Sequence, residues 1–125
     1  MNQVRVLVFY RHHFHEFFDK QSEKAKKKID YVLFLLTHID KVPEKFLKHI
    51  EGQKGLYEIR VEHGSNIFRI FCCFDKGKIV VLFNGYQKKS NKTSSKEIWQ
   101  RLWGKLTFLP SPYFFPQRIH RQNGT

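Results

Sequence analysis

The chain has 125 residues, with 23 Lys or Arg against 11 Asp or Glu, which gives a net charge of +12. Its hydrophobic content of 41% and aromatic content of 16% predict one folded domain and exclude a disordered chain. A positive excess of this size favours a polyanionic partner, first nucleic acid and second an acidic protein, and by itself leaves an anionic membrane open. No apolar run approaches the roughly 18 residues of a membrane span, so no transmembrane helix is predicted.

The two cysteines, Cys72 and Cys73, are adjacent in a predicted strand, so their side chains point to opposite faces and are not expected to form a disulfide. They lack the spaced partners of a zinc site, and we predict neither a metal nor a cofactor. Free thiols are typical of a reducing compartment. The apolar part of the N-terminus is too short for a secretory signal. These features predict a cytoplasmic protein.

The first half of the chain predicts one strand and two helices. Residues 3–10 are rich in Val, Leu and Phe, as strands are, and residues 11–19 predict a short helix or turn. Residues 21–40 predict the main helix, with Ser22 as its N-cap. Its apolar stripe has helical spacing and comprises Ile29, Val32, Leu33, Leu36 and Ile39. Four lysines near the start of this helix oppose its dipole, and either an electrostatic role or a solvated face explains them.

The second half predicts a meander and a closing helix. Residues 42–51 contain Pro43 and predict a turn of helix at 44–49. Three short strands follow, and then a helix capped by Ser94 or Ser95. Residues 104–125 hold all but one of the four prolines and no acidic residue, which predicts an irregular basic and aromatic tail after a domain at 1–103. The predicted class is a small α+β sandwich with the long helix packed on the apolar sheet face.

The register of the first hairpin follows from its turn. A two-residue loop at Gly64 and Ser65, with Gly first, places Arg60 opposite Arg69. This register sorts the apolar side chains onto one face and the charged ones onto the other. Like charges directly opposite one another destabilise a sheet, so the pair suggests an anion site. The alternatives are a solvated sheet face of mixed charge, or arginines paired with Glu58 and Glu62.

The second turn extends the same row. A two-residue loop at Lys76 and Gly77 would place Arg69 opposite Asn84 and Ile67 opposite Tyr86. The polar face would then present Arg60, Arg69 and Asn84 in line. Tyr86 and Lys88 would follow on the same side.

The meander resembles the RelE/ParE toxin superfamily, and within it the HigB-like group of phage-derived toxins. The matching pieces are HIEGQKGLYEIRVEHGSNIFRIF and DKGKIVVLFNGYQKKSNKTSSKEI, and the resemblance covers roughly residues 3–99. Two positions depart from the family pattern. Asn84 stands where these toxins commonly have His, which removes that residue as a general base, and Ser94 replaces a Pro.

The resemblance implies a small RelE-like α+β fold and a metal-independent, ribosome-dependent mRNA endoribonuclease. The attack of a ribose 2′-hydroxyl on the adjacent phosphate needs a base, an acid and cations that hold the developing charge. Arg60 and Arg69 suit the last role, with Lys88 adding charge and Tyr86 or His63 as the candidate for moving a proton. Further RNA- or phosphate-binding candidates are Lys48, Lys54, His63, Asn84, Lys89 and Lys92. His63 and Tyr86 also have structural readings, as a solvated turn residue and a half-buried aromatic.

The implied partners are mRNA, the ribosome and a cognate helix-turn-helix antitoxin, with a toxin–antitoxin hetero-oligomer and no membrane. Two alternatives stay open at this stage. One is a ParE-like toxin that inhibits DNA gyrase, and the other is a degenerate RNA-binding protein without catalysis.

Overall fold

The structure is a computed structural model that describes residues 2–89 and 92–103, so the predicted tail at 104–125 lies outside the described residues. The elements follow in the order β1 (Val6–Phe9), α1 (His13–Asp19), α2 (Glu23–His38), β2 (Leu47–His49), β3 (Tyr57–His63), β4 (Asn66–Asp75), β5 (Ile79–Lys88) and α3 (Ser95–Trp103).

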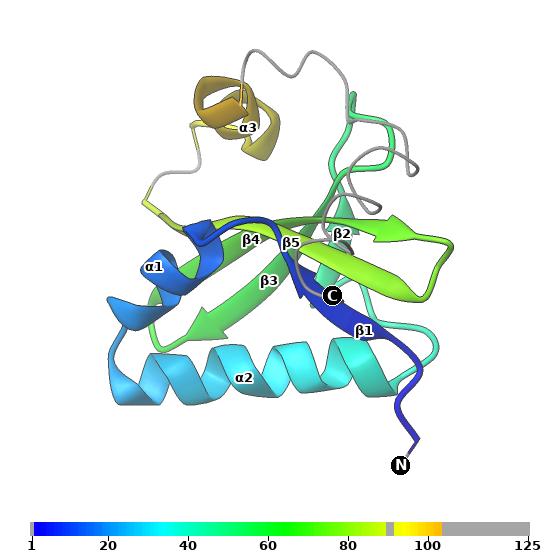
Figure 1. Cartoon of the computed structure of the whole chain (residues 1–125). Helices are drawn as coiled ribbons and strands as arrows, with labels where there is room; N and C mark the ends of the chain where they lie inside the picture. Colours follow the sequence, from blue (N-terminus) through cyan, green and yellow to red (C-terminus); the bar gives the residue numbers. More distant parts are fainter. Residues whose placement is uncertain (1, 90–91, 104–125) are drawn as a thin grey trace.

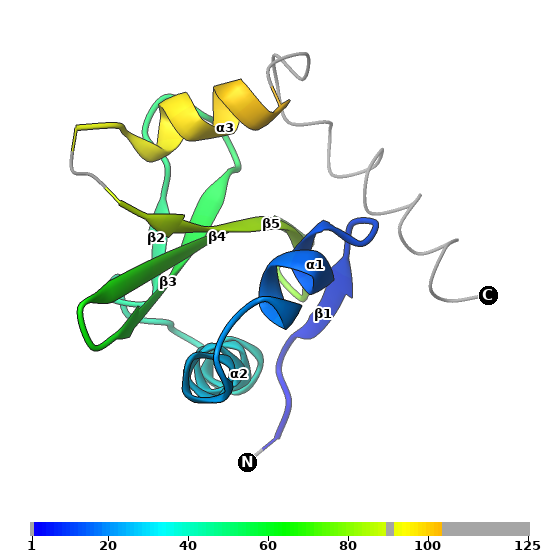
Figure 2. The ribbon, with the colours of Figure 1, turned by 90° about the vertical axis from the view of Figure 1, so that its left-hand side faces the viewer.

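The strands form one mixed sheet in the order β1-β5-β4-β3-β2, in which β1 runs parallel to β5 and the other neighbours are antiparallel. Helices α1 and α2 cover one face, and α3 lies across the other (Figures 1 and 2). The predicted α+β class is confirmed. Each face carries its own apolar core, one beneath α1 and α2 and one beneath α3.

Helix α2 forms where the apolar stripe predicts it. Ser22 caps its start, because the side chain accepts a hydrogen bond from the backbone N–H of Ala25 at 3.1 Å. Ile29, Val32 and Leu36 are almost fully buried against the sheet. Ile39 is already extended and acts as the C-cap, so the helix ends one residue before the end of the predicted stripe.

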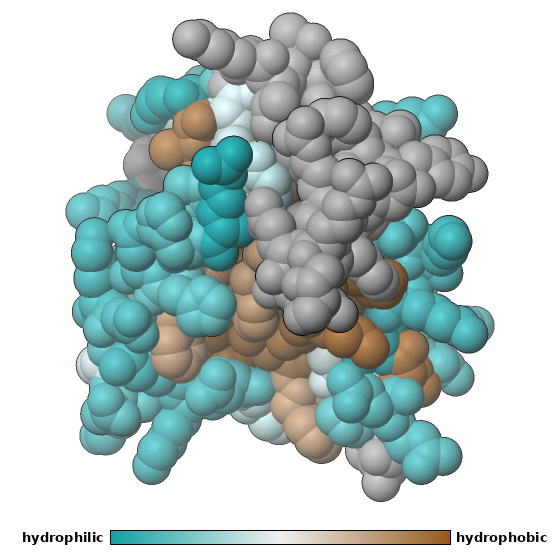
Figure 3. All heavy atoms as spheres, viewed as in Figure 1, coloured by the Kyte–Doolittle hydropathy of each residue, from teal (hydrophilic) through white to brown (hydrophobic). Residues whose placement is uncertain are grey.

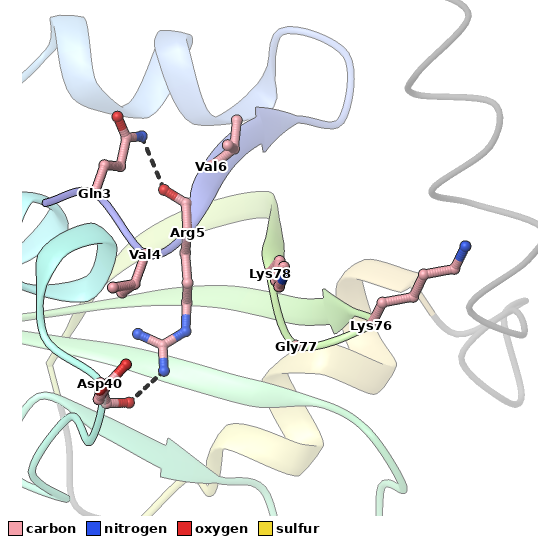
Figure 4. A pocket seen from close by; sticks show the side chains of 8 residues that line it. All are labelled: Gln3, Val4, Arg5, Val6, Asp40, Lys76, Gly77 and Lys78. Carbon is pink, nitrogen blue, oxygen red and sulfur yellow. Dashed lines mark hydrogen bonds between the residues drawn. The ribbon is translucent and has the colours of Figure 1, made fainter.

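The guanidinium of Arg5 caps the C-terminus of α2. It donates to the backbone carbonyls of Leu36, at 2.9 Å, and Ile39, at 2.6 Å, and also to that of Asp40. Figure 4 shows this side chain reaching from the segment before β1 toward Asp40, beside the β4–β5 turn. Carbonyls at a helix C-terminus lack intrahelical partners and carry partial negative charge, so a cation there is stabilising. The N-terminal segment is thereby fixed to the main helix.

The first hairpin has the predicted register throughout. Arg60 lies opposite Arg69, Ile59 opposite Ile70, and His63 opposite Asn66. Gly64 has a φ of +61°, the left-handed conformation that glycine adopts at no steric cost. Gly64, which the sequence predicts as the first loop residue, therefore sets the register that places Arg60 opposite Arg69.

The predicted register of the second hairpin is wrong. Lys76 and Gly77 adopt φ values of +55° and +74°, and Asp75 pairs with Ile79, so Lys78 becomes an additional loop residue. A further irregularity between Ile70 and Cys72 shifts the pairing again. Arg69 consequently lies opposite Tyr86, and Ile67 lies opposite Lys88. Asn84 does not stand opposite Arg69, so the predicted row loses this member.

The prediction of a helical turn at 44–49 is also wrong for its last three residues, because Leu47–His49 forms the short edge strand β2. It pairs with β3, where Leu47 lies opposite Ile59 and Lys48 opposite Glu58. The backbone N–H of Arg60 donates to the carbonyl of Phe46 at 2.8 Å, which extends this contact. Tertiary pairing overrides a local preference here.

An aromatic core holds α3 on the sheet. Trp99 is fully buried, with its ring centroid 5.2 Å from that of Phe71 and 5.4 Å from that of Phe83. With the Gln53 amide oriented to satisfy both groups, its oxygen accepts from Trp99 Nε1 at 2.9 Å. The β2–β3 loop and α3 are therefore packed against each other.

Gly85 in β5 allows α1 to approach the sheet closely. A Cβ at this position would lie 2.3 Å from the Phe17 ring. We expect Gly85→Ala to lower the free energy of unfolding by about 1–3 kcal/mol through overpacking. Urea denaturation measures this, with Phe17→Ala as the background control. In that background the added methyl should cost far less, and an equal cost in both would contradict the close contact.

Apolar side chains reach the surface around β1, the strand at one edge of the sheet. Figure 3 shows them between hydrophilic groups on the side where β1 lies. Val6 is 54% exposed, and Phe34 of α2 is 47% exposed. No helix within residues 2–89 and 92–103 has the length and apolar character needed to cross a membrane.

Candidate functional site

A cleft of about 790 Å³ opens on the sheet face that α3 covers in part. Its walls come from β2 and the following loop, from β3 and β5, and from the start of α3. The lining residues are Lys48, His49, Ile50, Glu51, Gly52, Glu58, Arg60, Lys88, Thr93, Ser94, Ser95 and Lys96. Four of these are cations and two are carboxylates, so the lining carries a net positive charge.

One buried carboxylate connects the two arginines. Glu58 Oε1 accepts from Arg60 Nε at 3.2 Å, while Glu58 Oε2 lies 3.7 Å from Arg69 Nε, an ion pair too long for a hydrogen bond. The Glu58 side chain is 5% exposed, against 25% for that of Arg60. Glu58 therefore draws two like charges to the same side of the sheet and offsets their repulsion. The structure thus combines the predicted arginine pair with the alternative in which a glutamate neutralises it.

Arg69 is the more buried of the two arginines. Its side chain is 8% exposed, and Nη1 has no hydrogen-bond partner among residues 2–89 and 92–103. Burial lowers the pKa of Arg69, and the neighbouring Glu58 carboxylate opposes that effect. A buried donor without a partner is costly in a folded protein and points to a functional role or an anion.

Ser95 joins α3 to this carboxylate. Its hydroxyl donates to Glu58 Oε2, and Tyr86 Oη lies 3.1 Å from Ser95 Oγ. Because the single Ser95 proton is committed to Glu58, the Tyr86 hydroxyl donates to Ser95. Burial raises the pKa of Tyr86, because the charged phenolate would be poorly solvated there. Tyr86 therefore keeps its proton at neutral pH.

The structure brings together only part of the predicted site. Lys48, Arg60 and Lys88 line the cleft, and Arg69 and Tyr86 contact its Glu58–Ser95 pair. The remaining candidates do not line the cleft: Lys54, His63, Asn84, Lys89 and Lys92. His63 lies at the end of the first hairpin, and Asn84 lies in the irregular part of β5, beside Gly85.

Nine lining residues were not predicted as site residues, among them His49, Glu58, Ser95 and Lys96. Glu58 was recognised only as a structural partner of the arginines. His49 borders the cleft at the end of β2, but its ring packs on that of Tyr57, with centroids 5.1 Å apart, on the face that α2 covers. Ser95 and Lys96 have no local signal, since only the packing of Trp99 brings α3 to the cleft. Among residues 2–89 and 92–103, no group of three His, Cys, Asp or Glu is placed to hold a metal ion.

Both cysteines lie outside the cleft as free thiols. Burial and the nearby Asp75 raise the pKa of Cys73 to about 12, and burial raises that of Cys72 well above its ordinary value. At pH 8 only about one Cys73 in ten thousand is then a thiolate, the reactive form. We expect iodoacetamide to label the native protein very slowly and the urea-unfolded protein readily, as mass spectrometry would measure. Because folding favours the protonated thiols, stability should also fall above the ordinary thiol pKa of 9.0. Rapid native labelling would contradict the burial.

Comparisons with known proteins identify the family of this chain. Curated proteins give no match. One similar solved structure is the crystal structure of the archaeal RelE–RelB complex from Pyrococcus horikoshii OT3, with 13% identity, a TM-score of 0.49, and coverage of 72% of this chain and 99% of that one. The family model described as phage-derived protein Gp49-like matches residues 16–100, more than half of the chain. The chain therefore belongs to the phage-derived Gp49-like family, as its resemblance to HigB-like toxins of the RelE type predicts.

Proposed function

We propose that this protein is the toxin of a type II toxin–antitoxin pair and acts as a metal-independent endoribonuclease on mRNA in the ribosome. Membership of the Gp49-like family supports the toxin role. The observation that carries the nuclease proposal is Arg60, which lines a basic cleft, lies opposite the buried Arg69 and shares the Glu58 carboxylate with it. Planar guanidinium groups match the oxygens of a phosphodiester.

In the proposed reaction, the ribose 2′-oxygen bonds to phosphorus and the bond from phosphorus to the 5′-oxygen breaks. The products are a 2′,3′-cyclic phosphate and a free 5′-hydroxyl. Glu58 engages the Nε edge of Arg60, so the terminal amino groups are left for the phosphate. Together with Lys48 and Lys88, they would hold the charge that develops on the pentavalent phosphorus.

Two protons move in this reaction. The 2′-hydroxyl loses one as it attacks, and the leaving 5′-oxygen gains one. Tyr86 keeps its proton because burial raises its pKa, so it suits the donor role rather than the base. His49, the one imidazole among the described residues that line the cleft, packs its ring on that of Tyr57, with centroids 5.1 Å apart, on the sheet face that α2 covers. We therefore assign it no proton transfer and propose that the 2′-hydroxyl proton passes to water. Water would take the role that the family commonly gives to a histidine at the position where this chain has Asn84.

The proposed partners follow from charge and family. The ribosome and mRNA would be bound largely through phosphate contacts, which a net charge of +12 favours. A cognate helix-turn-helix antitoxin, encoded beside the toxin, would neutralise it in a toxin–antitoxin complex. Charge complementarity with a protein of this basicity favours an acidic binding surface on the antitoxin.

Induced expression tests the proposal. We expect growth and translation to stop, and mRNA in a translating extract to be cut with 2′,3′-cyclic-phosphate and 5′-hydroxyl ends, the products of 2′-hydroxyl attack. The same mRNA without ribosomes should stay intact. Uncut mRNA together with DNA damage and altered supercoiling would indicate the gyrase-inhibiting alternative. Salt-sensitive RNA binding without cleavage would indicate the non-catalytic one.

A further inference from the structure

We propose that Lys96, in the first turn of α3, binds a second RNA phosphate adjacent to the scissile one. The cleft would then take a strand with at least two consecutive phosphodiesters, and α3 would be part of the binding site rather than only a cover for the sheet. This inference rests on the proposed function for its substrate class, and it adds a subsite that the arginine pair does not supply.

The backbone at Gly52 is shaped around the Lys96 ammonium. A Cβ on Gly52 would lie 2.8 Å from Lys96 Nζ and 3.2 Å from its Cε. Gly52 also has a φ of +81°, which side chains rarely adopt. The glycine thus leaves room for the lysine stem to cross the β2–β3 loop, and this contact directs the ammonium to the wall of the cleft.

The position of Lys96 in α3 is unfavourable for the helix itself. A cation in the first turn meets the positive end of the helix dipole, where an acidic residue is preferred. Ser94 and Glu97 provide the usual cap, since Ser94 Oγ accepts from the backbone N–H of Glu97 at 3.1 Å. Lys96 is therefore not needed for capping. The helix end and the ammonium instead add their positive potentials on the same side of the cleft.

No acidic side chain neutralises Lys96 within the described part of the chain, where it forms no ion pair. Arg60, in contrast, shares the Glu58 carboxylate. The two cations come from different walls, Arg60 from β3 and Lys96 from α3. The cleft volume of about 790 Å³ lies within the range of cavities that hold whole small ligands, so it has room for more than one phosphate group.

Oligonucleotides that differ by one phosphodiester test the subsite directly. We would titrate the protein, at low salt, with a dinucleotide and a trinucleotide whose riboses are 2′-O-methylated and cannot react. The wild type is expected to bind the trinucleotide about tenfold more tightly, the gain typical of one charge-assisted contact. Lys96→Met keeps the stem over Gly52 and should remove this gain while leaving dinucleotide affinity nearly unchanged. The salt slope for the trinucleotide should fall by about 0.7.

Matched variants separate a subsite from a general charge effect. Lys27→Met removes one exposed lysine from α2, on the opposite side of the sheet, and should keep the tenfold gain. Lys96→Arg should keep it too, and Lys96→Gln provides a second neutral variant if the first fails to fold. A gain that survives in both neutral variants, or no gain in the wild type, would overturn the inference. Failure of wild-type mRNA cleavage with a Lys96-dependent gain would instead reject the nuclease and retain the subsite.

Discussion

Arg60→Ala is expected to lower the rate of mRNA cleavage by about 10²–10³-fold, the loss seen when one preorganised donor to a transition-state charge is removed. Arg60 is the arginine that lines the cleft, and its Nε already engages Glu58, which fixes the direction of its terminal amino groups. The rate of cyclic-phosphate formation on a ribosome-bound mRNA measures the effect. Toxicity on induced expression should be relieved in parallel.

The controls for this substitution follow from the same geometry. Arg101→Ala removes an equal charge from the last turn of α3, outside the cleft lining. Because Arg101 is exposed, we expect this substitution to change the cleavage rate by less than about threefold. Arg60→Lys keeps the charge without the planar fork, so its rate should fall between the two. Equal rates for Arg60→Ala and Arg101→Ala would reject a specific phosphate role.

Glu58→Ala is expected to lower the free energy of unfolding by about 3–5 kcal/mol, because it leaves the buried Arg69 charge without its carboxylate. The substitution also removes the acceptor of Ser95 and so loosens the start of α3. Urea denaturation measures the effect. Glu58→Gln retains an oxygen acceptor and should cost less, although the charge pairing is lost.

Glu62 provides the matched control, because it lies on the same strand and is exposed. Glu62→Ala should change the free energy of unfolding by no more than about 0.5 kcal/mol. A Glu58→Ala cost within that small range would show that the carboxylate does not hold the arginines together.

The sequence predicts the arginine pair because the information that sets it is local. Gly64 fixes the loop, and the alternation of apolar and charged residues along β3 and β4 then admits one register. Ser22 and the stripe of α2 are local in the same sense, and both appear as expected. Short-range rules therefore suffice for the scaffold on which Arg60 and Arg69 stand.

The second hairpin follows different rules. Lys76 adopts a positive φ that its residue type does not signal, so the loop gains a residue at Lys78. The irregularity between Ile70 and Cys72 has no sequence signal either. Together with the longer loop, it places Tyr86 opposite Arg69, where Asn84 was expected. Each change is a single residue, and together they decide which side chain faces Arg69.

The rest of the cleft depends on long-range packing. Trp99 brings Ser95 and Lys96 over the sheet, and the pairing of β2 with β3 brings Lys48 to the opposite wall. Neither contact can be read from spacing within one segment. Sequence reasoning therefore found the cations on the central strands and missed the residues contributed by the walls.

The pairing of β1 with β5 has a consequence for synthesis of the protein. Strand β1, made early, pairs with β5, and the last wall of the cleft is α3. Contacts between segments so distant in the chain form slowly and only after both have emerged from the exit tunnel. The cleft of the nascent chain is therefore incomplete. The ribosome that synthesises the protein is exposed to the folded cleft only after this region has been made.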